Sequence, residues 1–395
     1  MNKKQLFLII LILWYSQCFS WMSFPIGSTM YGWISHILEF FLLLAYFAKR
    51  KSASYTFSRP VMCVMLIPFL SIISAVWMNG QTFMKGFVAL TSQFTFILYF
   101  LFHLYHYTKK DILRVVMIIG VVFCCIKIVQ QITYPTMWFC EASRINEITR
   151  LVEQRNGFWR IIMSCAGCAT IMLYYKFNEY VQTKHKVALI FVLLGCINVF
   201  LDLGRMGYAS TLIGLALVYI PDFTNPKNLI KIGVVGLLAY LVINNIDLIL
   251  GADMIEETNK NMGEDYVRWL SYDYFGSESI SSPIYFLFGH GPLVGTAAGL
   301  RLQDIEMNSG LWRSDIGIVG NIYDYGILFA LAIVYFFIFV LKRTKNIRWM
   351  FGYAFPTLIF SVMLPAFRGA ETNIMFSMML YLCDIEITEC KKLKY

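Results

Sequence analysis

The arginines of this chain are the residues whose type and position most clearly suggest chemistry. Arg205 lies in LDLGRMGYASTLIGLALVYI, residues 201–220, where Asp202 is the only other charged residue. A permanent cation at a membrane interface is costly unless it is paired or hydrated, so Arg205 is a candidate functional residue. The alternative is a structural ion pair between Arg205 and Asp202, three residues earlier.

His290 is a second candidate, in the segment FLFGHGPLVG. The glycines and Pro292 around it are typical of a turn that exposes the backbone. An imidazole on such a turn can act as a general base or donate a hydrogen bond to a phosphate. A purely structural role for this histidine remains open.

Several acids and one lysine need partners. Asp315 precedes an apolar helical run and is predicted to be its N-cap, with a catalytic base as the alternative. Asp324 is expected below the membrane interface, paired with a buried donor such as Lys127 or a tyrosine hydroxyl. Arg368 and Glu371 share one short segment and are expected to pair with each other.

The sequence predicts no metal and no cofactor. No His or Cys pair has metal-ligand spacing, and the acids form no D-x-D pair. The nucleotide motifs G-x-x-x-x-G-K-[ST] and G-x-G-x-x-G are both missing, which argues against ATP-driven transport and NAD chemistry. Most of the 10 cysteines stand in apolar runs, where Cys acts as a small hydrophobic residue.

The elements that must position these residues are predicted to be transmembrane helices. The chain is 58% hydrophobic and only 14% charged, whereas soluble domains carry about 25% charged residues. Apolar runs of roughly membrane-spanning length recur throughout. We therefore predict an all-α polytopic membrane protein with about twelve spans, at residues 5–21, 31–48, 60–78, 87–105, 112–132, 158–176, 187–203, 206–220, 229–250, 316–341, 349–366 and 374–387.

The basic residues predict the orientation of these spans. With both termini in the cytoplasm, the cytoplasmic segments hold 21 of the 33 Lys and Arg residues, in agreement with the positive-inside rule. Because basic residues are scattered over loops rather than gathered on one face, nucleic-acid binding is not expected. Localisation in the cytoplasmic (inner) membrane of a bacterium follows from the family resemblance described below.

The kind of basic residue differs between the two sides. The cytoplasmic segments hold 16 Lys and 5 Arg, and the opposite side holds 2 Lys and 9 Arg. A guanidinium group matches phosphate or carboxylate oxygens two at a time, so this bias suggests an anionic ligand, and a lipid pyrophosphate would fit. Pairing with acids or lipid headgroups is the alternative. The nine outer arginines are Arg144, Arg150, Arg155, Arg160, Arg205, Arg268, Arg301, Arg313 and Arg368.

Two outer segments divide the chain. Residues 1–250 are expected to hold the first nine spans, with an extracytoplasmic loop at 133–157. Residues 251–315 form the large extracytoplasmic loop between spans 9 and 10, and 316–395 hold the last three spans and a cytoplasmic tail. A loop of about 60 residues in a chain with otherwise short connections is expected to be functional.

Three segments occur in an order that resembles a known superfamily. They are LDLGRMGYASTLIGLALVYI, then YVRWLSYDYF followed by PIYFLFGHGP, and finally SDIGIVGNIYDYGILFALAIVYF. This order is similar to that of the bacterial O-antigen polymerase and ligase superfamily, with Wzy-type polysaccharide polymerases as the closer match. The resemblance implies a metal-independent, GT-C-like membrane glycosyltransferase. Such enzymes act on undecaprenyl-diphosphate-linked glycans at the outer face of the cytoplasmic membrane.

The resemblance also implies roles for individual residues. Arg205 matches the first essential arginine of the family, and Arg268 matches the arginine of the large loop. His290 lies near the position where the ligases keep a histidine. Ser314 and Asp315 replace the His-Asn pair of many ligase-like members, which disfavours the ligase function and leaves the general base as either His290 or Asp315.

The chemistry expected from this resemblance is transfer of a glycan from a lipid diphosphate. Arginines would stabilise the negative charge that develops on the leaving phosphate. We expect Arg205, Arg268, His290 and Asp315 to be catalytic, and the residues contacting substrate to be Arg144, Arg160, Arg313 and Arg368. Expected partners are the lipid-linked glycan, membrane lipids and a membrane protein that regulates chain length. The alternatives are an O-antigen ligase and, from a different class, a polysaccharide flippase or transporter.

Overall fold

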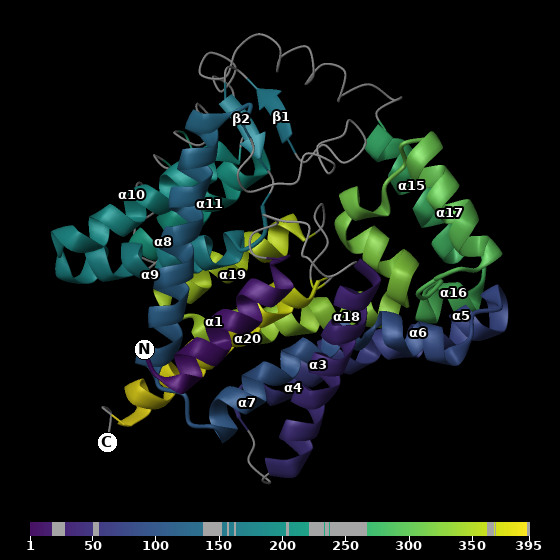
Figure 1. The fold of residues 1–395 in the computed structure, drawn as a ribbon, viewed down its shortest axis with the longest axis horizontal. Helices are drawn as coiled ribbons and strands as arrows, with labels where there is room; N and C mark the ends of the chain where they lie inside the picture. The colour runs from purple at the N-terminus through teal and green to yellow at the C-terminus, as the bar shows by residue number, and fades with distance from the viewer. Residues whose placement is uncertain are drawn as a thin grey trace.

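In the computed structural model of the chain, the secondary structure of the described residues is helical apart from one small hairpin of strands (Figure 1). The residues that the structure describes are 1–17, 28–49, 55–136, 152–155, 158–161, 163–202, 205–220, 233, 237, 267–361, 367 and 369–392. The all-α membrane character predicted from composition is confirmed in this coarse form. Four helices are long and apolar enough to cross a membrane, or five if a bent pair forms one span.

The first part of the chain contributes helices that follow one another with short connections. They are α1 (Lys3–Tyr15), α3 (Ser28–Lys49), α4 (Ser58–Leu66), the 3-10 helix η1 (Ile67–Leu70), α5 (Ser71–Asn79), α6 (Phe83–Ala89), the 3-10 helix η2 (Thr91–Ile97), α7 (Leu98–Leu104) and α8 (Lys109–Thr133).

The remaining elements begin with two short antiparallel strands. They are β1 (Val152–Arg155), β2 (Phe158–Ile161), α9 (Ala166–Thr183), α10 (Lys186–Leu201), α11 (Arg205–Tyr219), α15 (Val267–Ile280), α16 (Pro283–Phe288), α17 (Ala297–Asn308), the 3-10 helix η4 (Arg313–Asp315), α18 (Gly317–Thr344), α19 (Arg348–Phe360) and α20 (Ala370–Lys392).

The candidate membrane spans by length and composition are residues 29–49, 58–79, 109–133 and 317–344, together with the bent pair 83–89 and 91–104. Helices also occupy most of the other predicted spans, but whether each of them crosses the membrane stays a prediction. The span predicted at 229–250 lies almost entirely outside the described residues.

One predicted span begins too early. Residues 158–176 were expected to form a continuous helix, but 158–161 form strand β2, and α9 begins only at Ala166. Cys165, just before α9, has a left-handed backbone (φ 71°), which ends any helix at that point. Phe158–Ile161 are therefore a strand of a hairpin rather than the start of a span, with Ile161 buried and Phe158 exposed.

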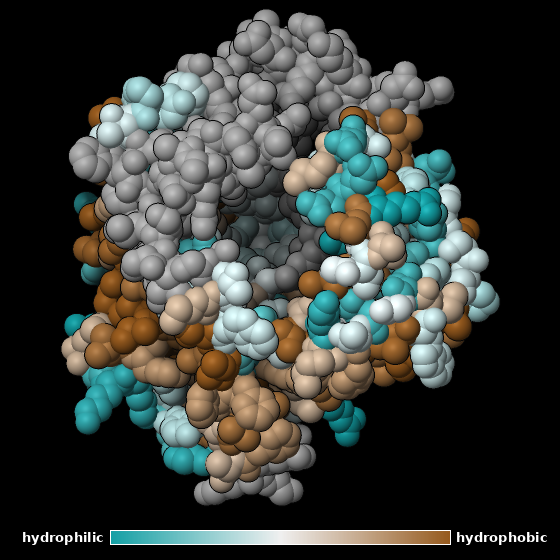
Figure 2. All heavy atoms as spheres, turned by 45° about the vertical axis from the view of Figure 1, so that its right-hand side comes forward, coloured by the Kyte–Doolittle hydropathy of each residue, from teal (hydrophilic) through white to brown (hydrophobic). Residues whose placement is uncertain are grey.

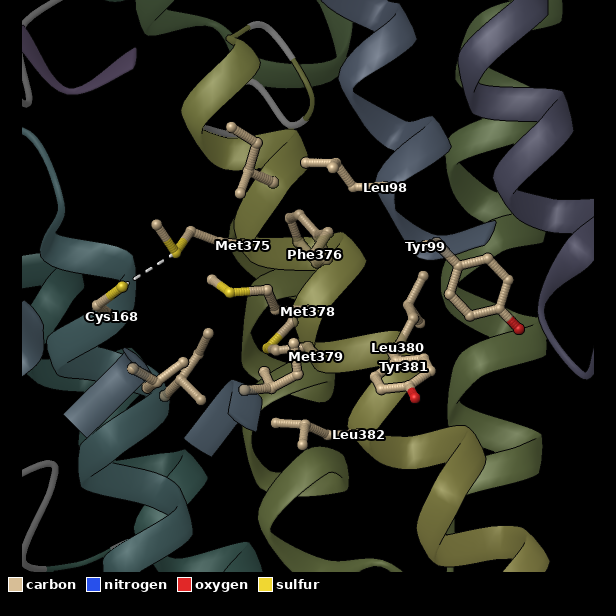
Figure 3. Packing of buried hydrophobic residues seen from close by; sticks show 14 of the residues in the cluster. Leu98, Tyr99, Cys168, Met375, Phe376, Met378, Met379, Leu380, Tyr381 and Leu382 are labelled. Atoms are coloured by element: carbon tan, nitrogen blue, oxygen red, sulfur yellow. Dashed lines mark hydrogen bonds between the residues drawn. The ribbon is translucent and has the colours of Figure 1, made fainter. Parts of the chain in front are cut away.

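Helix α20 lies at the centre of the hydrophobic core (Figure 3). Its residues from Ile374 to Cys383 are all buried, on every face of the helix. A helix that is surrounded on all sides must be apolar all round. Cys168 on α9 lies against it, with its sulfur 3.4 Å from the sulfur of Met375, in the hydrophobic role expected for these cysteines.

Capping side chains join the start of α1 to the start of α8. Asn2 caps α1 together with Gln5, and Thr108 caps α8 together with Asp111. The Asp111 carboxylate also accepts hydrogen bonds from the Asn2 amide at 2.7 Å and the Gln5 amide at 3.0 Å. The end of α20 lies at this same end of the molecule (Figure 1).

Candidate functional site

Residues 267–315, which we call the α15–α17 unit, pack onto the first half of α18. The unit shares a small core with the start of α18, formed by Phe275, Leu293 and Leu302 of the unit together with Ile316 and Tyr323. Figure 1 shows α15, α16 and α17 beside α18, at one side of the molecule. Figure 2 turns that side toward the viewer and shows hydrophilic side chains gathered over it. This unit is the described part of the large loop predicted at 251–315.

The turn that carries His290 is fixed by backbone hydrogen bonds to α18. The His290 amide donates to the Tyr323 carbonyl at 2.7 Å, and the Gly291 amide donates to the Asp324 carbonyl at 2.9 Å. Gly289 and Gly291 both have positive φ, of 76° and 72°, which glycine adopts without strain. The chain turns at these glycines as expected, but the amides of His290 and Gly291 are bonded to α18 rather than exposed, and His290 lies against α18.

A kink in α18 makes this docking possible. Gly326 has φ 78° and ψ 174°, far from helical values, so the helix changes direction there. A Cβ atom at Gly326 would lie 2.2 Å from the Leu287 carbonyl oxygen. Only glycine allows α16 to approach α18 this closely.

His290 is held between two aromatic rings. Its ring stacks on Tyr285 at 3.8 Å and on Tyr323 at 4.1 Å between centroids. Its Nε2 lies 3.4 Å from the Glu278 carbonyl oxygen, and the residue is only 5% exposed. Burial lowers the pKa of His290, so the imidazole is neutral at pH 7. A ring enclosed in this way is well suited to joining α15, α16 and α18, and poorly placed to reach a hydroxyl group in solvent.

Arg313 forms ion pairs with two acids. Its Nη1 lies 3.0 Å from Asp324 Oδ1, and its Nε lies 3.2 Å from Glu306 Oε1. The Asp324 carboxylate is the main cause of the raised pKa of Arg313. The guanidinium group thus links α17, η4 and α18, and its charge is largely balanced before any ligand arrives.

The expected pairing of Asp324 with Lys127 is wrong. Lys127 instead forms an ion pair with Asp202 at the end of α10, and it also donates to the Asn198 carbonyl at 3.3 Å. Lys127 is buried in a candidate membrane span, so it needs such a partner. Asp202 is therefore a partner of Lys127, and the side chain of Arg205 lies outside the described residues.

A cavity of about 270 Å³ lies between the unit, α18 and the α6–η2 connection. Its polar lining comes from Gln303, Glu306, Arg313, Asp324 and Tyr325. Its remaining lining residues are Ala89, Leu90, Gly291, Pro292, Leu293, Val294, Gly299 and Leu302. Small-molecule sites typically enclose about 300–1,000 Å³, so this cavity suits a group of roughly one sugar unit.

The other candidate residues are placed by their elements. Arg205 is the first residue of α11, and Arg268 is the second residue of α15. Arg160 lies in β2, in register with Glu153 of β1. The positions of Arg144 and Arg368 and the side chains of Arg160 and Arg205 lie outside the described residues.

Asp315 is not the N-cap of α18. The cap position is Ile316, which offers no side-chain hydrogen bond, and Asp315 ends the 3-10 helix η4 as an exposed residue. The 3-10 turn shifts the helix start by one residue, which hydropathy does not reveal. The structure therefore brings His290, Arg313 and Asp315 to the same end of α18, with only Arg313 lining the cavity.

Glu371 is a residue that sequence reasoning did not single out as a candidate base. Its carboxylate accepts a hydrogen bond from the Cys165 amide just before α9. Arg368, its expected partner, lies outside the described residues. Burial raises the pKa of Glu371 to about 6. Pairing with a backbone amide from a distant part of the chain leaves no signal in the sequence.

No protein-family model and no curated protein matches this chain. Within the described ranges, His, Cys, Asp and Glu form no group of three or more that could hold a metal ion. A function must therefore be argued from the charge pattern, the family resemblance and the geometry of the α15–α17 unit.

Proposed function

We propose that this protein is a membrane glycosyltransferase of the Wzy type. In this proposal it polymerises undecaprenyl-diphosphate-linked oligosaccharide units into a surface polysaccharide, at the outer face of a bacterial cytoplasmic membrane. The growing glycan leaves its lipid diphosphate and is transferred to a hydroxyl group of a new unit.

The excess of arginine over lysine on the predicted outer side is the observation on which the proposal mainly rests. Nine of the eleven basic residues there are arginines. In the described part of the large loop, Arg268, Arg301 and Arg313 belong to one folded unit, and Arg313 lines its cavity. An ordered unit with arginines and a cavity of sugar size supports transfer of an anionic, lipid-linked glycan.

The proposed reaction divides the arginines by role. Arg205 and Arg268 stabilise the diphosphate as its bond to the anomeric carbon breaks, because fixed guanidinium groups need no reorganisation during the reaction. Arg313 is paired with two acids, so its role here is to shape the cavity rather than to bind phosphate alone. A carboxylate such as that of Asp315 then accepts the proton of the attacking hydroxyl group.

The proposal can be tested with purified protein in proteoliposomes. Lipid-linked repeat units added to the protein should yield a ladder of longer lipid-linked chains and free undecaprenyl diphosphate. Arg268→Ala should abolish the ladder, and Lys184→Ala, far from the unit in sequence and exposed, should leave it unchanged. Failure of the wild-type protein to lengthen any chain would contradict the proposal.

A transporter remains the second candidate because of one structural observation. The bent pair Phe83–Ala89 and Thr91–Leu104 changes direction by 44° at a single residue. Broken spans of this kind are common at the substrate sites of transporters. A transporter would move lipid-linked units across the bilayer in the same proteoliposomes without lengthening them.

A further inference from the structure

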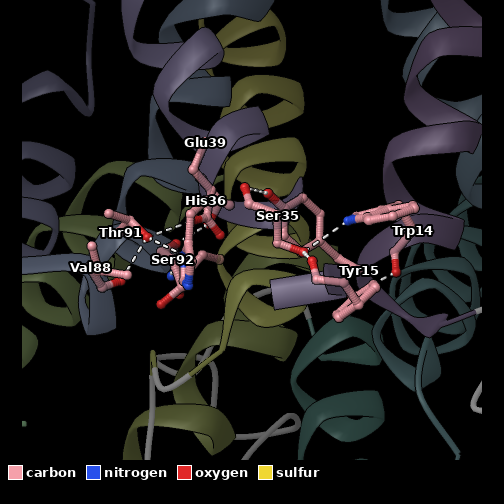
Figure 4. A network of polar contacts seen from close by, with 11 residues as sticks. Trp14, Tyr15, Ser35, His36, Glu39, Val88, Thr91 and Ser92 are labelled. Atoms are coloured by element: carbon pink, nitrogen blue, oxygen red, sulfur yellow. Dashed lines mark hydrogen bonds and ion pairs between the residues drawn. The ribbon is translucent and has the colours of Figure 1, made fainter. Parts of the chain in front are cut away.

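A polar cluster lies inside the membrane-embedded part, on the α3 helix and the start of η2 (Figure 4). His36 Nδ1 lies 2.7 Å from Thr91 Oγ1 and 3.3 Å from Glu39 Oε2. The Thr91 hydroxyl lies 2.6 Å from the same Glu39 oxygen, to which it can donate. Glu39 is only 2% exposed, within the candidate span 29–49.

The number of protons in this cluster follows from its burial. A lone carboxylate in hydrocarbon surroundings is strongly disfavoured, so the cluster should be neutral overall. Two arrangements satisfy this: a protonated Glu39 beside a neutral His36, or a Glu39 carboxylate beside a positively charged His36. Both arrangements hold one proton more than the deprotonated pair, in which a Glu39 carboxylate lies beside a neutral His36.

Among the described residues, the groups that interact with Glu39 supply no positive charge other than that of His36. Tyr15 of α1 hydrogen-bonds to Glu39, and Tyr31 is the other titratable group nearby. The titratable residues of α7 are Tyr99 and His103, and both contact Asp384: the Tyr99 hydroxyl donates to its carboxylate at 2.8 Å, and His103 Nε2 lies 3.2 Å from it. Among the described residues, the proton is therefore assigned to the pair of His36 and Glu39.

The cluster is next to the cavity described above. Thr91 is the first residue of η2, and the two residues before it, Ala89 and Leu90, line the cavity that contains Arg313 and Asp324. Thr91 also sits at the 44° bend between α6 and η2. A change in the hydrogen bonds of Thr91 to His36 and Glu39 would therefore move Ala89 and Leu90, which line the cavity.

We propose that His36, Glu39 and Thr91 form a proton-binding site, whose proton stabilises the contact between α3 and η2 beside the cavity. Loss of the proton to water leaves a net negative charge on the cluster. Water must then enter to solvate the carboxylate, which loosens the contact at the bend. This inference needs only the membrane-embedded fold and does not depend on the proposed glycosyltransferase activity.

The test is a pH titration of the full-length protein in nanodiscs, followed by infrared difference spectroscopy between about pH 5 and about pH 8, where imidazole charge changes. The wild-type protein should show a pH-dependent band of Glu39, from the protonated carboxyl group or from the carboxylate beside a charged His36, and this band should disappear in Glu39→Gln. In Thr91→Val, which keeps the carboxyl group but removes its hydroxyl partner, the band should shift in frequency. Hydrogen exchange of residues 87–97, corrected for its intrinsic pH dependence, should accelerate at high pH in the wild type only.

Glu371→Gln is the matched control, because Glu371 is also a buried carboxyl group but lies outside the cluster. It should lose its own band and leave the exchange of residues 87–97 unchanged. Identical difference spectra for the wild type and Glu39→Gln would overturn the inference. The inference would also be overturned if Thr91→Val left the Glu39 band unchanged and hydrogen exchange at η2 did not depend on pH.

Discussion

Individual side chains attach the α15–α17 unit to α18. Arg313 is one of them, because it forms two ion pairs. Its two ion pairs reach Glu306 on α17 and Asp324 on α18. Their side chains are 15% and 11% exposed, and that of Arg313 is 29% exposed. Pairs this well shielded matter mainly because breaking them leaves an uncompensated charge.

Arg313→Gln should therefore destabilise the protein by about 3 kcal/mol, the lower end of the range for breaking a buried pair, since Arg313 is partly exposed. In an Asp324→Asn background the same change should cost clearly less, because the carboxylate charge is already gone. Unfolding free energies of the four proteins in a double-mutant cycle measure the difference. If Arg313→Gln lowered the unfolding free energy equally in both backgrounds, the Arg313–Asp324 pair would not stabilise the protein.

His290 predicts how stability depends on pH. Its folded-state pKa is lowered by burial, whereas the unfolded chain should titrate near the ordinary value of about 6.5. The unfolded state then binds the proton more readily, so the stability from neutral His290 is present above about pH 6.5 and is lost as the pH falls below it.

His290→Phe keeps an aromatic ring between Tyr285 and Tyr323 but cannot be protonated. We expect it to remove part of the acid sensitivity of the α15–α17 unit between about pH 6.5 and about pH 5. Hydrogen exchange of residues 283–291 across this range measures the effect. Equal acid sensitivity of variant and wild type would contradict the buried, neutral state of His290.

At the scale of elements, the kink of α18 and the turn after α16 form one joint. Gly326 and Gly289 both have positive φ, and each would place a Cβ atom against the backbone of the other element. The α15–α17 unit can dock only while both positions are glycine. The joint therefore sets the shape of the cavity.

Gly326→Ala should disrupt this joint, because the added Cβ would lie 2.2 Å from the Leu287 carbonyl oxygen at a φ unfavourable for alanine. We expect lower thermal stability and faster proteolysis of the unit. Gly276→Ala is the control: it lies in helix α15 with nothing within 4 Å of a Cβ atom, and it should stabilise by about 0.5–1 kcal/mol.

The sequence was a good guide to the existence of helices and a poor guide to their interruptions. Apolar runs predicted α3, α8 and α18, because length and hydropathy alone define a candidate span. The strand at Phe158–Ile161 pairs with Val152–Arg155, and the break at Leu90 lies between two apolar helices. Hydropathy does not reveal either interruption.

The candidate site was predictable to a similar degree. The turn at His290 followed from its glycines, but the stacking of its ring between two tyrosines did not. The sequence suggested Lys127 or a tyrosine hydroxyl as the partner of Asp324, whereas Asp324 pairs with Arg313 and Lys127 pairs with Asp202. Pairing between elements is decided by packing, which one sequence does not specify.

At the scale of the whole molecule, the helices form a membrane-embedded body and the α15–α17 unit forms a polar part attached through α18 (Figures 1 and 2). The first residues of α1 and the end of α20 lie at the same end of the body, as expected if both termini are cytoplasmic. The proposed reaction requires the α15–α17 unit to face the extracytoplasmic side, where the proposal places the lipid-linked glycans.

The most direct test of the proposed function is the length of the surface polysaccharide in cells that lack this gene. Gel electrophoresis should show chains reduced to a single repeat unit, and the wild-type gene should restore the long ladder. Arg205→Ala and Arg268→Ala, at normal protein levels, should leave the chains short. Complete loss of attached chains would indicate a ligase instead, and normal long chains from both variants would contradict the account.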